Sequence, residues 1–178
     1  MADTHMVEVR ARASMTSRAV PEDVYDVIAD LRSHMVWAGE RAPDPTFKLL
    51  TMEAPEGAAA VGTEFTSTGA NFNGTFHDRS VVTEATRPSV FVIESRSRLD
   101  RKRGKEWEAH FVHRYDVEPA STGSRITCSE TIHPVNYVPY WVKPWSRSIL
   151  RWFLERAVRK HLGNLARLAE ERSTVAGG

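Results

Sequence analysis

Apolar and polar residues alternate near the start of the chain and then change to a helical spacing. Between Val7 and Ser14 every second residue is apolar, and this period of two predicts a half-buried strand. Pro21 then opens a helix, because proline is favoured at the first helical position. Its apolar residues from Val24 to Leu31 form one stripe. A second short helical turn is expected from Arg32 towards Trp37, and Pro43 and Pro45 prevent it from continuing.

The region from Phe47 to Ile132 carries one strand signal after another, separated by turn sequences. The expected strands are Phe47–Ala54, Val61–Ser67, Thr75–Thr83, Ser89–Arg98, Trp107–Val117 and Arg125–Ile132. Their hairpin-length connections predict an antiparallel, strongly curved sheet. Gly69–Gly74 has two interpretations, a polar hairpin loop and a flexible lid.

A long amphipathic helix is predicted from about Ser146 to Arg172. The stripe that it buries consists of Leu150, Leu154, Val158, Leu162, Leu165 and Leu168. Such a helix can bury its stripe only against the concave face of the sheet, and a sheet wrapped around a helix rarely fills its interior. The predicted fold class is therefore α+β. It consists of a seven-stranded curved antiparallel sheet around a long C-terminal helix, two short helices after strand 1, and an internal cavity. Residues 1–172 are expected to form one domain and residues 173–178 a frayed tail.

Several segments also match a known family. They are Ala19–Asp30 at the first helix, Trp37, Val61–Phe65, Tyr115–Pro119 and Gly123–Thr127. In these segments the chain resembles the helix-grip proteins, which include START-like lipid-binding proteins, plant Bet v 1 allergens and bacterial polyketide cyclase/dehydrases. The resemblance implies the helix-grip fold and a small apolar or amphipathic ligand. It does not choose between binding and catalysis, because only a minority of these relatives are enzymes.

The last hairpin offers the most informative pair of residues. If its turn closes between Glu118 and Arg125, opposed residues have numbers that sum to 243, and His113 faces Glu130. That face is otherwise apolar or aromatic, and a slip of one residue would turn one strand over. Three roles stay open for the pair: orienting a bound ligand, acid/base catalysis by His113, and a purely structural contact.

Aromatic residues on the same fold could line a pocket, although any one of them could equally be plain core. Asn71 and Asp78 are added as polar candidates. The predicted ligand-binding residues are Trp37, Phe65, Asn71, Phe76, Asp78, Phe91, Trp107, Phe111, His113, Tyr115 and Glu130.

Other chemistry is disfavoured. Cys128 is the single cysteine, so neither an intrachain disulfide nor a cysteine-built metal cluster can form. In an apolar wall its thiol would have a raised pKa and be a poor nucleophile. His110 and His113 resemble metal ligands, but their odd spacing on a strand points them to opposite faces. We expect no metal and no cofactor.

The formal charge of +1 conceals an uneven distribution. Residues 21–64 hold nine acids and three bases, whereas residues 96–105 hold six bases and one acid, and residues 143–172 eight bases and three acids. The 96–105 segment is interpreted as a solvated hairpin tip, and nucleic acid is not an expected partner. Tryptophans beside the bases, Trp141, Trp145 and Trp152 with Lys143, Arg147 and Arg151, suggest transient contact with an anionic membrane. The preferred interpretation is that these tryptophans cover the end of the cavity.

The chain lacks a signal-peptide pattern at Met1–Met6 and an apolar run long enough for a membrane span, so a cytoplasmic location is expected. The predicted function is binding or carriage of a small hydrophobic or amphipathic ligand, such as a lipid, a polyketide or another aromatic metabolite, in the cavity between the sheet and the C-terminal helix. The alternatives are a polyketide cyclase/dehydratase-type enzyme with His113 as acid/base, and a protein- or membrane-interaction module that uses the basic C-terminal helix. The sequence does not determine the oligomeric state.

Overall fold

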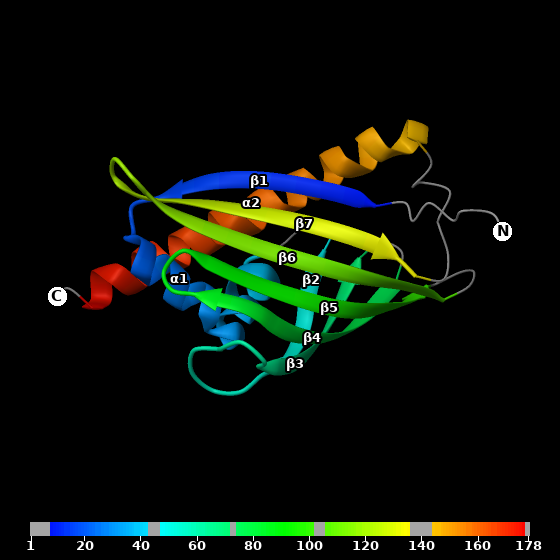
Figure 1. Ribbon diagram of the computed structural model, residues 1–178, viewed down its shortest axis with the longest axis horizontal. Coiled ribbons are helices and arrows are strands. Elements are labelled where there is room, and N and C mark those ends of the chain that lie inside the picture. The colour runs from blue at the N-terminus through cyan, green and yellow to red at the C-terminus, as the bar shows by residue number, and fades with distance from the viewer. Residues whose placement is uncertain (1–7, 43–46, 72–73, 102–105, 136–143, 177–178) are drawn as a thin grey trace.

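One antiparallel sheet organises the molecule. The structure, a computed structural model, describes residues 8–42, 47–71, 74–101, 106–135 and 144–176. The strands are β1 Val9–Ser17, β2 Lys48–Glu53, β3 Glu64–Asn71, β4 Gly74–Thr86, β5 Val90–Arg101, β6 Trp107–Ala120 and β7 Gly123–Pro134. They lie in the order β1-β7-β6-β5-β4-β3-β2, and the long helix α2, Pro144–Ala176, crosses one face of the sheet (Figure 1). The predicted α+β arrangement is confirmed.

The chain between β1 and β2 crosses from one edge of the sheet to the other. It contains α1, Pro21–Ala29, then a 3-10 turn η1, Leu31–Ser33, and a short π-helix η2, Met35–Glu40. Pro21 stands at the start of α1, and Glu22 and Asp23 complement the helix dipole in its first turn. The helical turn predicted after α1 is therefore present, but as two short elements.

The β6–β7 hairpin has the register that the alternation predicts. His113 pairs with Glu130, Tyr115 with Cys128, and Ala120 with Gly123 across the turn. No bulge interrupts this ladder along its described length. The two strands therefore present one face of alternate residues to the helix and the other to solvent.

The β3–β4 hairpin corrects the prediction of a loop at Gly69–Gly74. β3 continues to Asn71, β4 begins at Gly74, and Gly69 pairs with Phe76. A Cβ on Gly69 would overlap the ring of Phe76, so this glycine makes room for an aromatic neighbour and does not mark a loop. The Asn71 side-chain oxygen accepts the Gly74 N–H at 3.2 Å within the turn. The flexible-lid interpretation is therefore wrong for the described part of this segment.

The stripe of α2 is buried as expected. Val158, Leu162, Leu165 and Leu168 are buried against the sheet and α1, and Leu154 is half-buried; the side chain of Leu150 lies outside the described residues. The helix continues to Ala176, where the sequence suggested a frayed tail from residue 173. The Ser173 hydroxyl bonds Ala169 O and the Asp23 carboxylate, which holds this last turn in place.

The start of α2 departs from the prediction in another way. Trp152 does not cover a cavity end or pack on the sheet, because 57% of its surface is exposed. Trp141 and Lys143 lie outside the described residues, as do the side chains of Trp145 and Arg147.

Two groups of buried side chains form the core. The larger one joins α1, η2 and the second half of α2 to the middle of the sheet, and includes Phe91, Ile126 and Leu165. The smaller one includes Leu99 and Trp107, and Leu154 of α2 packs against this group. The candidate site lies on the sheet surface that these two groups cover.

Candidate functional site

Three ionisable side chains gather on the inner face of the sheet. His113 on β6 faces Glu130 on β7, and Asp78 lies on β4. Electrostatic effects of His113 reach both carboxyl groups, and Asp78 also acts on Glu130. We call His113, Glu130 and Asp78 the inner polar cluster. The structure thus brings together the predicted pair and the additional candidate Asp78.

Serines on neighbouring strands hold Asp78. The Ser67 hydroxyl donates to Asp78 Oδ2 at 3.4 Å, and Ser97, its partner in the β4–β5 ladder, also forms a hydrogen bond with it. One position further along the same face, the hydroxyls of Ser80 and Ser95 bond each other at 2.8 Å. A band of small polar residues therefore runs across the inner faces of β3, β4 and β5.

Burial changes the acid–base behaviour of the two carboxyl groups. It raises the pKa of Glu130, an effect that His113 opposes and Asp78 increases. Burial also raises the pKa of Asp78. Hydrogen bonds from Ser97 and Ser67 and the electrostatic effect of His113 partly lower it again. Each carboxyl group therefore keeps its proton to a higher pH than an exposed acid would, and can donate it from there.

The inner polar cluster is less buried than other residues on the same face of the sheet. Asp78, His113 and Glu130 are only half-buried, although they lie on the face that α2 covers, and their neighbour Phe111 is half-buried too. Tyr115 and Trp107, further along the same face of β6, are 7% exposed. The accessible surface is thus concentrated at the polar middle of the wall, where a small molecule could touch it.

Aromatic rings surround this region. Phe111 stacks parallel to His113 with centroids 6.0 Å apart, and Trp107 meets Phe111 edge-on at 6.2 Å. From α2, His161 lies edge-on to Trp37 at 6.3 Å and to Phe47 at 5.7 Å. The wall is therefore apolar and aromatic around a polar centre, which is the usual composition of a small-molecule site.

Trp37 has a buried donor without an acceptor. Its ring is 3% exposed and lies against His34, Tyr115 and His161, and its indole Nε1 finds no hydrogen-bond partner within the described residues. Asn164 on α2 donates to the backbone oxygens of Trp37 and Arg41 at 3.0 and 2.9 Å, which fixes η2 against the helix. An unpaired buried N–H is costly and in native proteins calls for an explanation.

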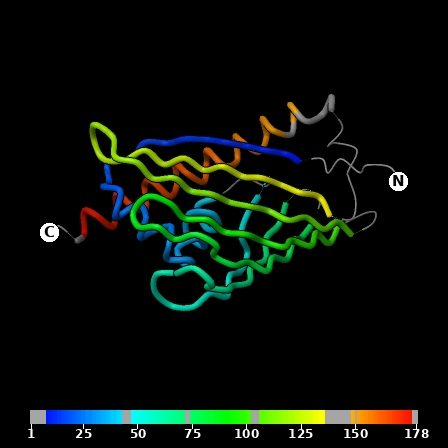
Figure 2. The backbone as a smooth tube through the Cα atoms, viewed as in Figure 1, coloured from blue at the N-terminus to red at the C-terminus, as the bar shows by residue number. Residues whose placement is uncertain are grey.

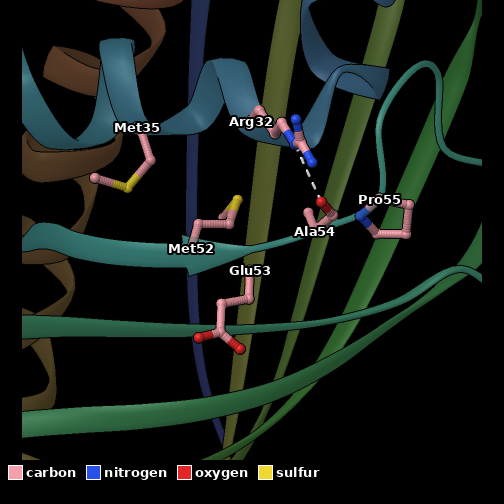
Figure 3. A pocket seen from close by; sticks show the side chains of 6 residues that line it. All are labelled: Arg32, Met35, Met52, Glu53, Ala54 and Pro55. Carbon is pink, nitrogen blue, oxygen red and sulfur yellow. Dashed lines mark hydrogen bonds between the residues drawn. The ribbon is translucent and has the colours of Figure 1, made fainter.

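A surface hollow of about 680 Å³ opens between η2 and β2. Its lining residues are Arg32, Met35, Met52, Glu53, Ala54 and Pro55 (Figure 3). Met35 and Met52 lie on its two sides and pack against the larger core group that contains Trp37. Arg32 closes one end, donating to Ala54 O at 3.1 Å and pairing with Glu56 at 2.8 Å. Flexible methionines thus separate this hollow from the buried core.

The other predicted ligand-binding residues divide between the two core groups. Trp37, Phe65, Phe91 and Tyr115 belong to the larger group, and Phe76, Trp107 and Phe111 to the smaller one. Asn71 is different, because its side-chain oxygen is used within the β3–β4 turn. The structure does not bring Asn71 together with the inner polar cluster.

The structure also shows the surroundings of the residues for which the sequence disfavoured metal binding or nucleophilic catalysis. His110 lies on the opposite face from His113, 3.3 Å from a Glu94 oxygen and stacked on His133. Burial raises the pKa of the Cys128 thiol well above its usual value, which disfavours the thiolate form. Within the described residues no group of three or more His, Cys, Asp or Glu side chains could hold a metal ion.

Sequence reasoning missed three contributors to the site: His34, His161 and the serine band. His34 is 5% exposed and donates from Nε2 to Ile28 O at 2.8 Å. The serines could have been found, because Ser95 and Ser97 occupy alternate positions between Ile93 and Leu99 on the buried face of one strand. The two histidines carry no such signal, since their positions depend on how η2 and α2 pack.

The family can now be stated. The sequence profile of the family "Polyketide cyclase / dehydrase and lipid transport" matches residues 8–170. The chain belongs to this family. The match confirms the resemblance seen in the sequence, and no curated protein matches the chain at the significance required.

Solved structures of related fold agree. Protein CV1439 from Chromobacterium violaceum is 18% identical with a TM-score of 0.60, covering 90% of this chain and 96% of its own. TTHA0849 from Thermus thermophilus is 16% identical with a TM-score of 0.58, covering 93% and 99%. The di-domain ARO/CYC StfQ of the steffimycin biosynthetic pathway is 15% identical with a TM-score of 0.64, covering 94% of this chain and 52% of StfQ. At these identities the likeness concerns the fold of this family member.

Proposed function

We propose that this family member binds a small, mainly apolar molecule between the sheet and α2, and that the inner polar cluster orients it. The observation that carries the proposal is the accessible surface on Asp78, His113 and Glu130, side chains that lie on the covered face of the sheet. A ligand there would bury aromatic surface at about 25 cal/mol per Å² and give the polar groups partners.

The chemistry of the site favours an uncharged ligand that has oxygen atoms. The Trp37 N–H requires an acceptor, and a carbonyl, ether or hydroxyl oxygen would provide one. An anionic ligand would meet two carboxyl groups whose charged forms are already disfavoured by burial. A neutral aromatic or polycyclic molecule with carbonyl or hydroxyl groups fits these conditions.

The first test replaces His113 by glutamine. We expect the variant to bind Nile red, a neutral polycyclic dye with a carbonyl oxygen, about three- to tenfold more weakly than the unmodified protein, the effect of losing one hydrogen bond. Fluorescence titration measures the dissociation constant, and native mass spectrometry shows any co-purified molecule. His110→Gln is the matched control, because it makes the same change on the outer face of β6. Equal affinities for the two variants would contradict a role for His113.

A second prediction concerns the indole N–H of Trp37. Trp37→Phe keeps an aromatic ring and removes the unpaired donor. Affinity for Nile red should fall about threefold or more, while the free energy of unfolding stays the same or rises, because an unsatisfied group is lost. Trp152→Phe removes an exposed indole and should change neither quantity. A parallel loss of stability and affinity in Trp37→Phe would instead indicate a packing role.

Catalysis is the second candidate function. The observation that favours it is the coupling of His113 to two carboxyl groups of raised pKa, an arrangement that can give and take a proton. The molecule identified by native mass spectrometry decides between the two. If incubation with the protein returns it chemically changed, and His113→Gln returns it unchanged, the protein is an enzyme; release of the intact molecule supports carriage.

A further inference from the structure

The first described turns of α2 expose large apolar side chains. Ile149, Trp152 and Phe153 are 57%, 57% and 48% exposed. They lie at positions i, i+3 and i+4, so they share one face of the helix. The inward face of the same segment contains Leu154 and Val158, which are packed against the core. This outward apolar face, Ile149–Trp152–Phe153, is therefore exposed in the described part of the structure.

Basic residues continue the same outward face. Arg156 and Lys160 follow Phe153 at helical spacing and are exposed, as is Arg159 beside them. Residues 148–160 hold four bases and one acid, Glu155, which pairs with Arg151 at 2.9 Å. Arg156 and Arg159 have no ion-pair partner in the part of the chain that the structure describes. The helix face is thus apolar at its start and cationic immediately after.

The second half of α2 is different. Glu170 binds the Arg18 side chain and its backbone N–H, Glu171 pairs with Arg41, and Arg172 pairs with Asp30. These pairs connect the end of α2 to the β1–α1 region and to η2, so its charges are largely matched within the molecule. Among the described bases of α2, Arg156 and Arg159 lack an ion-pair partner, and both lie in the first half of the helix.

Neighbouring elements add to the same end of the molecule. A hollow of about 480 Å³ lies between Glu8–Arg10 and the α2 residues Ser148 and Arg151. Leu154 packs against the smaller buried group, which includes Leu99 near the end of β5 and Trp107 at the start of β6, so these strand ends lie near the same part of α2. The first and last turns of α2 lie towards opposite ends of the molecule (Figure 2).

We propose that the Ile149–Trp152–Phe153 face of α2 docks on the surface of a bilayer that contains anionic lipids. Tryptophan and phenylalanine partition to the boundary between headgroups and acyl chains, and the neighbouring arginines bind lipid phosphates. The helix lies on the surface, since no described helix is long and apolar enough to cross a membrane. A second copy fits less well, because a two-fold contact through this face would bring its cations together. The proposal concerns a surface distinct from the ligand site.

Flotation with lipid vesicles tests the proposal with the whole chain and no added ligand. The protein should float with vesicles of phosphatidylglycerol and phosphatidylcholine at low salt. It should remain in solution with phosphatidylcholine alone or at about 0.5 M NaCl, where charge attraction is screened. Brominated lipids should quench its tryptophan fluorescence, and Trp152→Phe should float normally with much of this quenching lost.

Paired variants identify the face responsible. Trp152→Ser with Phe153→Ser, and separately Arg156→Gln with Arg159→Gln, should each reduce the vesicle-bound fraction about tenfold or more. The controls remove equivalent groups elsewhere: Val61→Ser, whose side chain is 63% exposed, and Arg12→Gln with Arg125→Gln, both exposed. All variants alter exposed side chains, and unchanged melting temperatures and Nile red affinities show that fold and ligand site are intact.

Three results would overturn the proposal. One is no flotation with anionic vesicles at low salt. A second is flotation that the two α2 variants leave unchanged or the control variants reduce equally. The third is a dimer in solution, seen by light scattering, that Trp152→Ser with Phe153→Ser converts to a monomer, because the face would then be an interface between copies. Weakened Nile red binding by His113→Gln with normal flotation would separate this surface from the ligand site.

Discussion

Replacing Gly123 by alanine is expected to destabilise the protein by about 2–5 kcal/mol, combining left-handed backbone strain with overpacking. Gly123 has a φ of +90°, and a Cβ there would overlap Ser17 O and lie 2.6 Å from the Arg18 carbonyl carbon. Because this turn holds the β6–β7 hairpin against the end of β1, the chain cannot easily move away. Urea denaturation measures the change in the free energy of unfolding.

Gly57 provides the matched control. Its φ is +86°, close to that of Gly123, but no atom lies within 4 Å of the position of its Cβ. Gly57→Ala should therefore cost only the backbone strain, about 1–2 kcal/mol. If both variants lose the same stability, the close approach of the hairpin turn to β1 has no energetic consequence, and the argument from packing is wrong.

The hairpin that ends at Gly123 also shows why part of the site was predictable. The pairing of His113 with Glu130 follows from a strict period of two on both strands and one turn position, and the observed register is the same. Asp78 reaches this pair only through the β4–β5 and β5–β6 ladders, and the first of these contains a bulge between Val82 and Glu84. The local sequence pattern is enough to predict the register of one hairpin. To predict a site that spans several strands, the bulges and the twist of the sheet must also be known.

Glycine composition was the misleading signal. The Gly-rich stretch Gly69–Gly74 suggests a loop by composition, yet Gly69 is a strand residue below the Phe76 ring, which itself stacks on Phe47 with centroids 4.6 Å apart. The function of this glycine depends on a side chain that arrives from the next strand. From the local sequence alone, a glycine that permits a turn looks the same as a glycine that makes room for a neighbouring side chain.

The charge asymmetry of the sequence has a structural counterpart. Acids of the acidic segment 21–64 form ion pairs with bases that are distant in the sequence. Asp26 pairs with Arg87 at 2.8 Å, and Asp30 pairs with Arg172 at 3.0 Å. The bases Arg156 and Arg159 have no such partner among the described residues. The formal charge of +1 therefore conceals acids that are paired with distant bases, and bases on α2 that have no acidic partner among the described residues.

Acidification is expected to remove about 3 kcal/mol of stability through one residue, His34. Burial lowers its pKa to about 4, helped by nearby His113 and opposed by the hydrogen bond to Ile28 O and by Asp30. Because the folded-state pKa is below the ordinary value of 6.5, the unfolded chain takes up a proton first. The contribution of His34 is therefore complete above about pH 6.5 and is lost as the pH falls towards 4, at 1.36 kcal/mol per pKa unit.

His34→Gln isolates this effect, because the glutamine amide can still donate to Ile28 O but does not titrate. The decisive quantity is the slope of the free energy of unfolding between about pH 7 and pH 4, measured with urea for both proteins. The raised pKa values of Glu130 and Asp78 act in the opposite direction, because their neutral forms favour the folded state as pH falls. These contributions remain in both proteins and cancel in the comparison, so parallel stability curves would show that His34 is not held neutral by burial.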